Sequence, residues 1–134
     1  MKSDAVARWH EVLGEPETDE QLRHLDALLH DDVVFHSPVL HRPVEGKMAT
    51  SLYLQAAARV LVNDHWRYVR ELLDGPHAAL EFITEVDGLV VNGIDLITFD
   101  DEERIIDFKV MIRPFRAIEK LKQKMAEMMQ ALQG

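Results

Sequence analysis

Cysteine is absent from this chain of 134 residues. Without thiols the chain can form neither a disulfide framework nor a zinc site built on thiolates. The absence suits a reducing compartment. Residues 1–9 also lack the apolar core of a signal peptide, so the sequence predicts a cytoplasmic protein.

Basic residues are scarce as well. The chain has 15 Lys and Arg against 24 Asp and Glu, a formal net charge of -9. Binding to nucleic acid needs a basic face, and so does docking on anionic membranes, so neither partner is expected. No run approaches the ~20 apolar residues of a membrane span. At 47% hydrophobic residues, the chain is expected to fold as a single domain over residues 1–134.

The 6 glycines and 5 prolines fall mostly between periodic segments. Apolar residues at helical spacing predict helices over residues 5–13, 18–29, 47–62 and from 114 onward. Alternating and β-branched runs predict strands over residues 33–37, 66–73, 77–86, 89–99 and 104–112. Helices grouped against an antiparallel meander indicate an α+β domain.

Local signals define several of these boundaries. Thr18 is expected to cap the second helix, with the Gln21 side chain reaching back to it in a capping box. The polar run from His30 to Asp32 is expected to separate that helix from the first strand. Asp87-Gly88 predicts a tight hairpin. The last strand is expected to turn four side chains inward: Ile106, Phe108, Val110 and Ile112.

Asp95 is the most informative residue of the chain. It interrupts an apolar, β-branched strand pattern and shares one strand face with Gly93, Ile97 and Phe99. A carboxyl group in apolar surroundings has a raised pKa, because desolvation disfavours its ionised form. Such a group can donate a hydrogen bond or act as a general acid near neutral pH. The alternative is an edge strand on which Asp95 simply faces water.

Two segments together resemble the nuclear-transport-factor-2-like superfamily. The first is residues 28–38, with Asp31-Asp32 leading into a hydrophobic strand that ends before a proline. The second is residues 93–106, with Ile94-Asp95 and a later Phe99-Asp100. The enzyme branches of this superfamily include ketosteroid isomerase, SnoaL-type polyketide cyclases and limonene epoxide hydrolase. The resemblance implies a curved sheet rolled into a cone around an apolar pocket, often in a homodimer.

The resemblance also implies roles for individual residues. Asp95 stands at the position of the protonated Asp in the oxyanion hole of ketosteroid isomerase, and Trp9 at the position of its Tyr. Ser37 stands where that enzyme has its general base. A Ser hydroxyl cannot abstract a carbon-bound proton near pH 7 without a partner, so steroid isomerisation by the family mechanism is not expected. The other predicted pocket residues are Tyr53, Phe35, Phe82, Phe108 and Val110.

Seven histidines raise the question of a metal site. His36 and His41 are five residues apart, which is not a recognised zinc spacing, and no HExxH motif occurs. We therefore expect no metal and no cofactor. Both histidines lie near the predicted pocket entrance, so an acid–base step would be carried by one of them or by Asp95. The predicted catalytic residues are Asp95, Ser37 and His36.

The strand that carries Asp95 is apolar on both faces, because Ile94 and Leu96 oppose Ile97 and Phe99. A sheet that is apolar on both faces needs two covers. Helices can cover one face, and a second subunit is expected to cover the other. The sequence therefore predicts a homodimer through the face of Ile94 and Leu96.

Two functions are compatible with these residues. One is an isomerase-, cyclase- or hydratase-like enzyme in which Asp95 donates a hydrogen bond to a developing enolate. The other is a non-catalytic small-molecule-binding or accessory dimeric domain that keeps the pocket but not the base. In both, the expected ligand is a small hydrophobic compound of carbonyl type.

Overall fold

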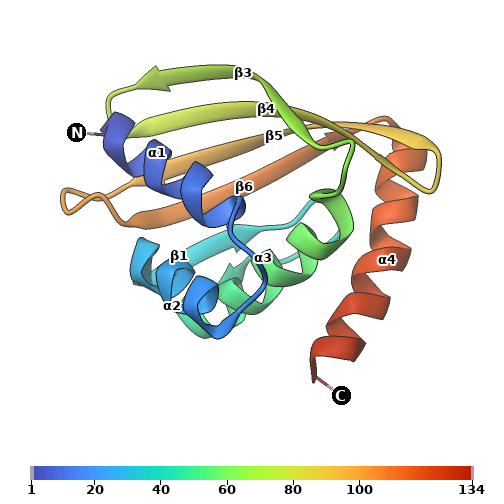
Figure 1. Ribbon diagram of the computed structural model, residues 1–134, viewed down its shortest axis with the longest axis horizontal. Helices are drawn as coiled ribbons and strands as arrows, with labels where there is room; N and C mark the ends of the chain where they lie inside the picture. The colour runs from blue at the N-terminus through green and yellow to red at the C-terminus, as the bar shows by residue number, and fades with distance from the viewer. Residues whose placement is uncertain (1, 134) are drawn as a thin grey trace.

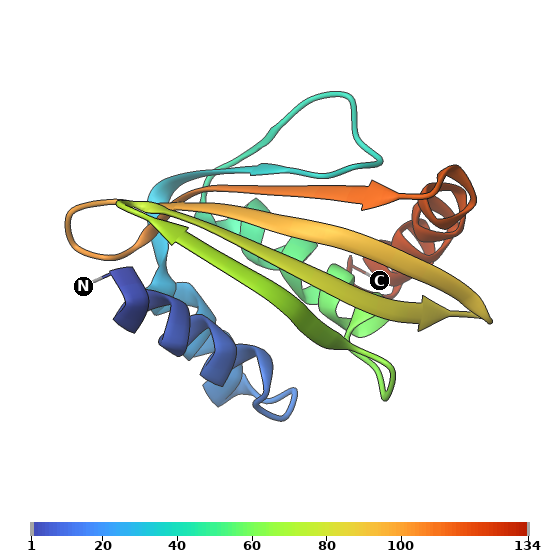
Figure 2. The same ribbon diagram turned by 90° about the horizontal axis from the view of Figure 1, so that it is seen from above.

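The computed structural model describes residues 2–133 and shows one curved sheet with helices on its inner side (Figures 1 and 2). The helices are α1 (Lys2–Leu13), α2 (Asp19–Leu28), α3 (Lys47–Leu61) and α4 (Phe115–Gln133). The strands are β1 (Leu29–His36), β2 (Val44–Glu45), β3 (Arg67–Asp74), β4 (His77–Val86), β5 (Leu89–Phe99) and β6 (Ile105–Arg113). None of these described helices is long and apolar enough to cross a membrane.

The six strands lie in the order β2-β1-β6-β5-β4-β3. All neighbours are antiparallel except β1 and β6, which are parallel. Helices α1, α2 and α3 lie on one side of the sheet, and α4 lies near one end of it (Figure 2). This arrangement confirms the expected α+β class with a curved sheet.

The core lies on the inner, concave side of the sheet. Alternation along β4 and β5 buries every second residue there, as the period-two pattern predicts. The largest fully buried side chains are contributed by four strands: Phe35, Leu80, Phe82, Ile97 and Phe108. From α4, Ala117, Leu121 and Met125 are buried against the remainder of the domain.

The start of β1 and the inward face of β6 differ from the prediction. The run from His30 to Asp32 belongs to β1 instead of breaking the chain, because Leu29 is fully buried and pairs with Ile105 of β6. Tertiary pairing therefore outweighs the polar character of that run. In β6 the register shifts, so the fully buried residue is Ile105, and Ile106 is only half-buried. The prediction that Ile106 points inward was wrong.

The start of α2 also differs in detail. Thr18 is the N-cap and accepts a hydrogen bond from the Gln21 backbone N–H at 3.2 Å, as expected. The Gln21 side chain, however, donates to the carbonyls of Val12 and Glu15, at 2.7 and 3.0 Å. Gln21 therefore ties α2 to the end of α1 instead of completing a capping box.

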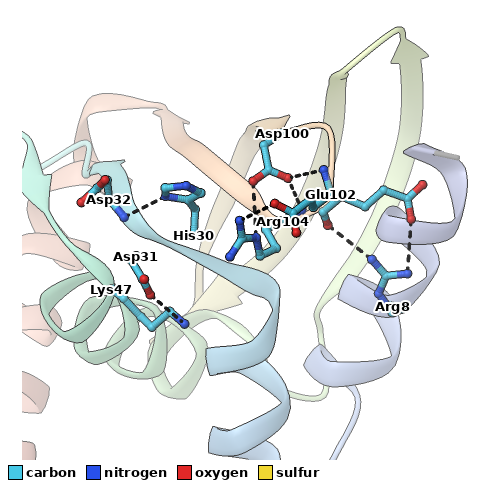
Figure 3. Close-up of polar contacts among 9 residues, drawn as sticks. Arg8, His30, Asp31, Asp32, Lys47, Asp100, Glu102 and Arg104 are labelled. Carbon is cyan, nitrogen blue, oxygen red and sulfur yellow. Dashed lines mark hydrogen bonds and ion pairs between the residues drawn. The ribbon is translucent and has the colours of Figure 1, made fainter.

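Polar contacts hold α1 against the turn between β5 and β6 (Figure 3). The Asp100 carboxylate accepts backbone hydrogen bonds from Glu102 and Arg104, at 2.8 and 2.9 Å, which fixes the turn. Arg8 of α1 donates to the Glu103 carbonyl at 3.3 Å and forms an ion pair with its carboxylate at 3.6 Å. These contacts help to fix the position of Trp9, the next residue of α1.

Candidate functional site

Asp95 points into the concave side of the sheet and is only 5% exposed. Its direct cross-strand neighbours are Leu80 of β4 and Val110 of β6, both apolar and buried. Burial raises the pKa of Asp95 to about 7, although a hydrogen bond from Tyr68 acts in the opposite direction. The burial agrees with the expectation of a raised pKa, and Asp95 is not an exposed residue of an edge strand. At neutral pH a large fraction of this carboxyl is protonated.

Two side chains are connected in series to the Asp95 carboxyl. Tyr68 of β3 donates its hydroxyl hydrogen to Asp95 Oδ2 at 2.5 Å. The Trp9 indole of α1 donates to the Tyr68 oxygen at 2.9 Å. Burial and the neighbouring Asp95 carboxylate raise the pKa of Tyr68 well above its ordinary value, so this phenol keeps its proton.

The direction of these two hydrogen bonds follows from the chemistry of the three side chains. An indole N–H can only donate, so the Tyr68 oxygen accepts from Trp9 and its single hydrogen is free to point at Asp95. Tyr68 is the one hydrogen-bonding partner that the described residues give to the Asp95 side chain. A protonated Asp95 can therefore donate from its other oxygen to a bound molecule.

Tyr68 and Glu71, both of β3, were missed by sequence reasoning. A β-bulge between Tyr68 and Arg70 adds one residue to β3, which puts Tyr68 and Glu71 on the same face, opposite Phe82 and Leu80. Simple alternation would separate Tyr68 from Glu71. Bulges of this kind often redirect a side chain next to a site. The only sequence signal was the aromatic pair of Trp66 and Tyr68 at the start of the strand.

Aromatic rings surround the hydrogen-bonded series of Trp9, Tyr68 and Asp95. Trp66 stacks on Phe82 with ring centroids 4.5 Å apart and meets Tyr68 edge-on at 5.0 Å. Trp9 meets Phe108 edge-on at 5.1 Å. These contacts fix the indole and the phenol in place and keep the surroundings of the carboxyl apolar.

Most of the predicted pocket residues belong to the packed core. Phe35, Phe82, Phe108 and Val110 are buried on the concave side. Tyr53 of α3 stacks on Phe35 with centroids 6.2 Å apart. These positions are compatible with the lining of an inner site, although no contact joins Tyr53 to the Asp95 chain among the described residues.

The other two predicted catalytic residues lie elsewhere. The Ser37 hydroxyl oxygen accepts the Val39 N–H at 3.2 Å, a local turn contact. His36 points to the outer side of the sheet, where its Nε2 lies 2.9 Å from an Asp107 carboxylate oxygen. The structure does not bring His36 to Asp95, so its catalytic role stays an untested prediction without support from position. His41 lies on the exposed loop after β1.

Two of the surface hollows in the described part of the chain are well defined, and neither is lined by Asp95. The larger, about 490 Å³, lies between the connection of α1 to α2 and the second half of α3, with Leu13, Gln21 and Arg59 among its walls. The smaller, about 270 Å³, lies on the outer side of the sheet beside Ile94 and Met111.

Comparison with known proteins supports the fold described above. The sequence profile of the SnoaL-like domain matches residues 6–108. A steroid delta-isomerase from Pseudomonas aeruginosa is 34% identical, with a TM-score of 0.87 over 98% of this chain and 93% of that one. An uncharacterised protein with a cystatin-like fold from Silicibacter pomeroyi is 30% identical, with a TM-score of 0.82 over 92% and 83%.

More distant structures share the fold. A putative isomerase of the SnoaL-like family from Agrobacterium tumefaciens is 14% identical, with a TM-score of 0.63 over 84% of this chain and 97% of that one. A sequence comparison with curated proteins gave no match. The profile match covers more than half of the chain, and the chain belongs to the SnoaL-like domain family.

Proposed function

We propose that the concave side of the sheet binds a small hydrophobic carbonyl compound and promotes an isomerase- or cyclase-like proton shift in it. The observation that carries the proposal is the directed chain from Trp9 through Tyr68 to Asp95. It ends on a buried carboxyl that is about half protonated at neutral pH, because its pKa is about 7.

Such a series of hydrogen bonds can stabilise an enolate. When a proton leaves the carbon next to a carbonyl, negative charge develops on the carbonyl oxygen. A preorganised donor in apolar surroundings stabilises that charge far better than water does. The Asp95 carboxyl supplies the donor, and the Tyr68 and Trp9 bonds behind it hold it in orientation.

Related proteins support the same reaction class. The Pseudomonas aeruginosa relative is named a steroid delta-isomerase, and the Agrobacterium tumefaciens relative a putative isomerase. For this chain we propose a non-steroid substrate, because Ser37 replaces the base that the family resemblance places before Pro38.

A second candidate is a non-catalytic binding domain with the same ligand class. The observation in its favour is that Asp95 has apolar cross-strand neighbours, Leu80 and Val110, and no base beside it among the described residues. A bound carbonyl compound would then be held by the Asp95 donor without losing a proton.

We also propose that the protein is a homodimer through the outer side of the sheet. Ile94 and Leu96 lie there half-buried, beside Met111, which is 48% exposed, and the hollow of about 270 Å³. No described helix covers this face (Figure 2). A second copy would remove this apolar area from water.

The binding proposal is tested with 2-naphthol, a planar hydroxyl compound that resembles an enol. Its fluorescence differs between the neutral and ionised forms, and naphthalene is a control of the same shape without the oxygen. We expect the protein to bind 2-naphthol more tightly than naphthalene. The Asp95→Leu and Tyr68→Phe variants should lose most of that preference, roughly 10- to 100-fold for a hydrogen bond to a charged group. Equal binding of the two compounds to the unmutated protein would refute the proposal.

Catalysis is separated from binding with 3-cyclohexenone, whose double bond moves into conjugation when a proton is shifted. The isomerase proposal expects an absorbance increase that depends on Asp95. Binding of 2-naphthol without any shift of 3-cyclohexenone would favour the non-catalytic domain.

A further inference from the structure

A single cross-strand row runs through Asp95 on the concave side of the sheet. From one side to the other it consists of Ser37, Val110, Asp95, Leu80 and Glu71. Ser37 continues this register one residue beyond the last pair of β1 with β6. Neighbouring strands are about 4.8 Å apart, so Asp95 lies two strand spacings, about 10 Å, from either end.

The two ends of this row differ in chemistry. At one end the Ser37 hydroxyl accepts a local backbone N–H, and no described side chain that could act as a base is hydrogen-bonded to it. At the other end the Glu71 carboxylate oxygen lies 2.6 Å from His10 Nε2. The β-bulge of β3 is what turns Glu71 to this side.

His10 is also in contact with the chain that leads to Asp95. It follows Trp9 in α1, and its ring meets the Tyr68 ring edge-on with centroids 5.0 Å apart. The imidazole, the phenol and the Glu71 carboxylate therefore form one cluster where α1 runs beside β3 (Figure 2).

The bond to Glu71 determines which His10 nitrogen is free. A carboxylate only accepts, so Nε2 carries the hydrogen and the neutral ring keeps its lone pair on Nδ1. None of the described residues forms a hydrogen bond with His10 Nδ1. Histidine is the side chain that most often serves as a general base.

We propose that His10, oriented by Glu71, is the general base of this site, acting on carbonyl compounds with an acidic C–H next to the carbonyl. This inference rests on the proposed function. His10 Nδ1 takes the proton from carbon, and the electron pair moves onto the carbonyl oxygen, which accepts a hydrogen bond from Asp95. Return of the proton from His10 to another carbon of the enolate completes an isomerisation without any further reactant.

A matched pair elsewhere in the chain provides the control. His24 Nδ1 lies 2.7 Å from a Glu15 carboxylate oxygen, so His24 is paired with a glutamate as His10 is, but through its other ring nitrogen. His24 is on α2, outside the row through Asp95, and has no ring contact with Tyr68. A purely structural role for such pairs predicts the same behaviour for both histidines.

The test uses 5-nitrobenzisoxazole, which reports proton removal from carbon. A base takes its C–H proton, the electron pair forms a nitrile, and the N–O bond breaks to give a coloured phenolate. We expect the protein to accelerate this elimination. His10→Ala should lower kcat/KM by about 10²- to 10⁴-fold, and added imidazole should restore part of the rate. His24→Ala should leave the rate unchanged.

Several results would overturn the inference. These are no acceleration by the unmutated protein, an unchanged rate in the His10→Ala variant, and a loss that imidazole does not restore in a variant with an intact circular dichroism spectrum. Glu71→Gln should lower kcat by about 10-fold or more with little change in KM, because Glu71 orients the base without touching the substrate.

Failure of this inference is distinguishable from failure of the proposed function. If the His10→Ala variant eliminates at the unmutated rate while the protein still prefers 2-naphthol to naphthalene, the base assignment is wrong and the Asp95 donor stands. If the unmutated protein shows no preference for 2-naphthol, the proposed function itself is wrong.

Discussion

The two faces of β5 have opposite chemistry on the same strand. The inner face carries Asp95 between buried apolar residues, and the outer face carries Ile94 and Leu96 partly exposed to water. On the inner face one polar group, removed from water, acquires a raised pKa and a directed hydrogen bond. On the outer face, the partly exposed apolar side chains form a surface that another molecule can cover. The surroundings thus decide what each side chain does.

Charged side chains also differ between the outer and inner faces of the sheet. On the outer side they are paired across strands, as in His36 with Asp107 at 2.9 Å and Arg70 with Glu81 at 3.5 Å. Such exposed pairs contribute little to stability. Asp95 on the inner side has a phenol instead of a cation as its partner. The inner face therefore carries the buried carboxyl on which the proposed function rests, and four predictions test this difference between the two faces.

The largest expected effect concerns the Ser37 end of the inner row. With 5-androstene-3,17-dione as test substrate, turnover should be absent or about two to four orders of magnitude below that of an enzyme with a base there. Ser37→Asp should raise any trace activity, because this position continues the row to Asp95. The measurement is the absorbance of the conjugated ketone. Rapid formation of androstenedione by the unmutated protein would contradict the prediction.

The next effect is the pH dependence that Asp95 gives to stability. Its pKa is raised from 3.8 to about 7 in the folded protein. Deprotonation is therefore harder in the folded state, and the contribution of this group to stability is fully present below about pH 4. It is lost as the pH rises to about 7, by about 4 kcal/mol in all.

Asp95→Asn removes this dependence and keeps a neutral group of the same shape. Compared with the unmutated protein, the variant should gain stability steadily between about pH 4 and 7, as measured by urea unfolding at each pH. Tyr68→Phe should shift the window upward, because the Tyr68 bond lowers the Asp95 pKa. A carboxyl midpoint near 4 in NMR titration would show that Asp95 is an ordinary solvated carboxylate.

The sequence was sufficient to find Asp95 because alternation along β5 is regular, with each residue paired in order against β4. The same reasoning missed Tyr68 and Glu71 because the bulge in β3 changes which residues share a face. A bulge depends on the twist of the neighbouring strands, and the sequence of β3 contains no local signal that predicts it. Ile106 was misplaced for the same reason, by the register shift in β6.

The fold was more predictable than the site. Helices and strands follow from local periodicity, and the motifs around residues 28–38 and 93–106 indicated the family. The contact between His10 and Glu71 joins residues 61 positions apart in the chain. Only the packing of α1 against β3 brings them together, and neither residue carries a local signal.

A third effect tests how tightly the inner face is packed. A Cβ at Gly93 would lie 2.3 Å from Phe82 Cζ, and that ring is fully buried and stacked on Trp66. Gly93→Ala should therefore cost about 1–3 kcal/mol of unfolding free energy. Gly14→Ala is the control, because a Cβ there meets its nearest atom at 3.5 Å and should be tolerated. Equal denaturant midpoints for the two variants would show that Phe82 moves freely.

The smallest effect on the fold is expected on the outer face, where Ile94→Glu should leave the unfolding free energy of a single subunit almost unchanged. Ile94 is only partly buried, and a carboxylate there can reach water. Its effect should fall on association, because a second copy covering this face would bury the charge without a partner. Sedimentation at micromolar concentration should show a dimer for the unmutated protein and a monomer or aggregate for the variant. Met48→Glu introduces the same charge at an 88% exposed residue of α3 and should stay dimeric. A monomeric unmutated protein would show that the outer face does not bind a second copy.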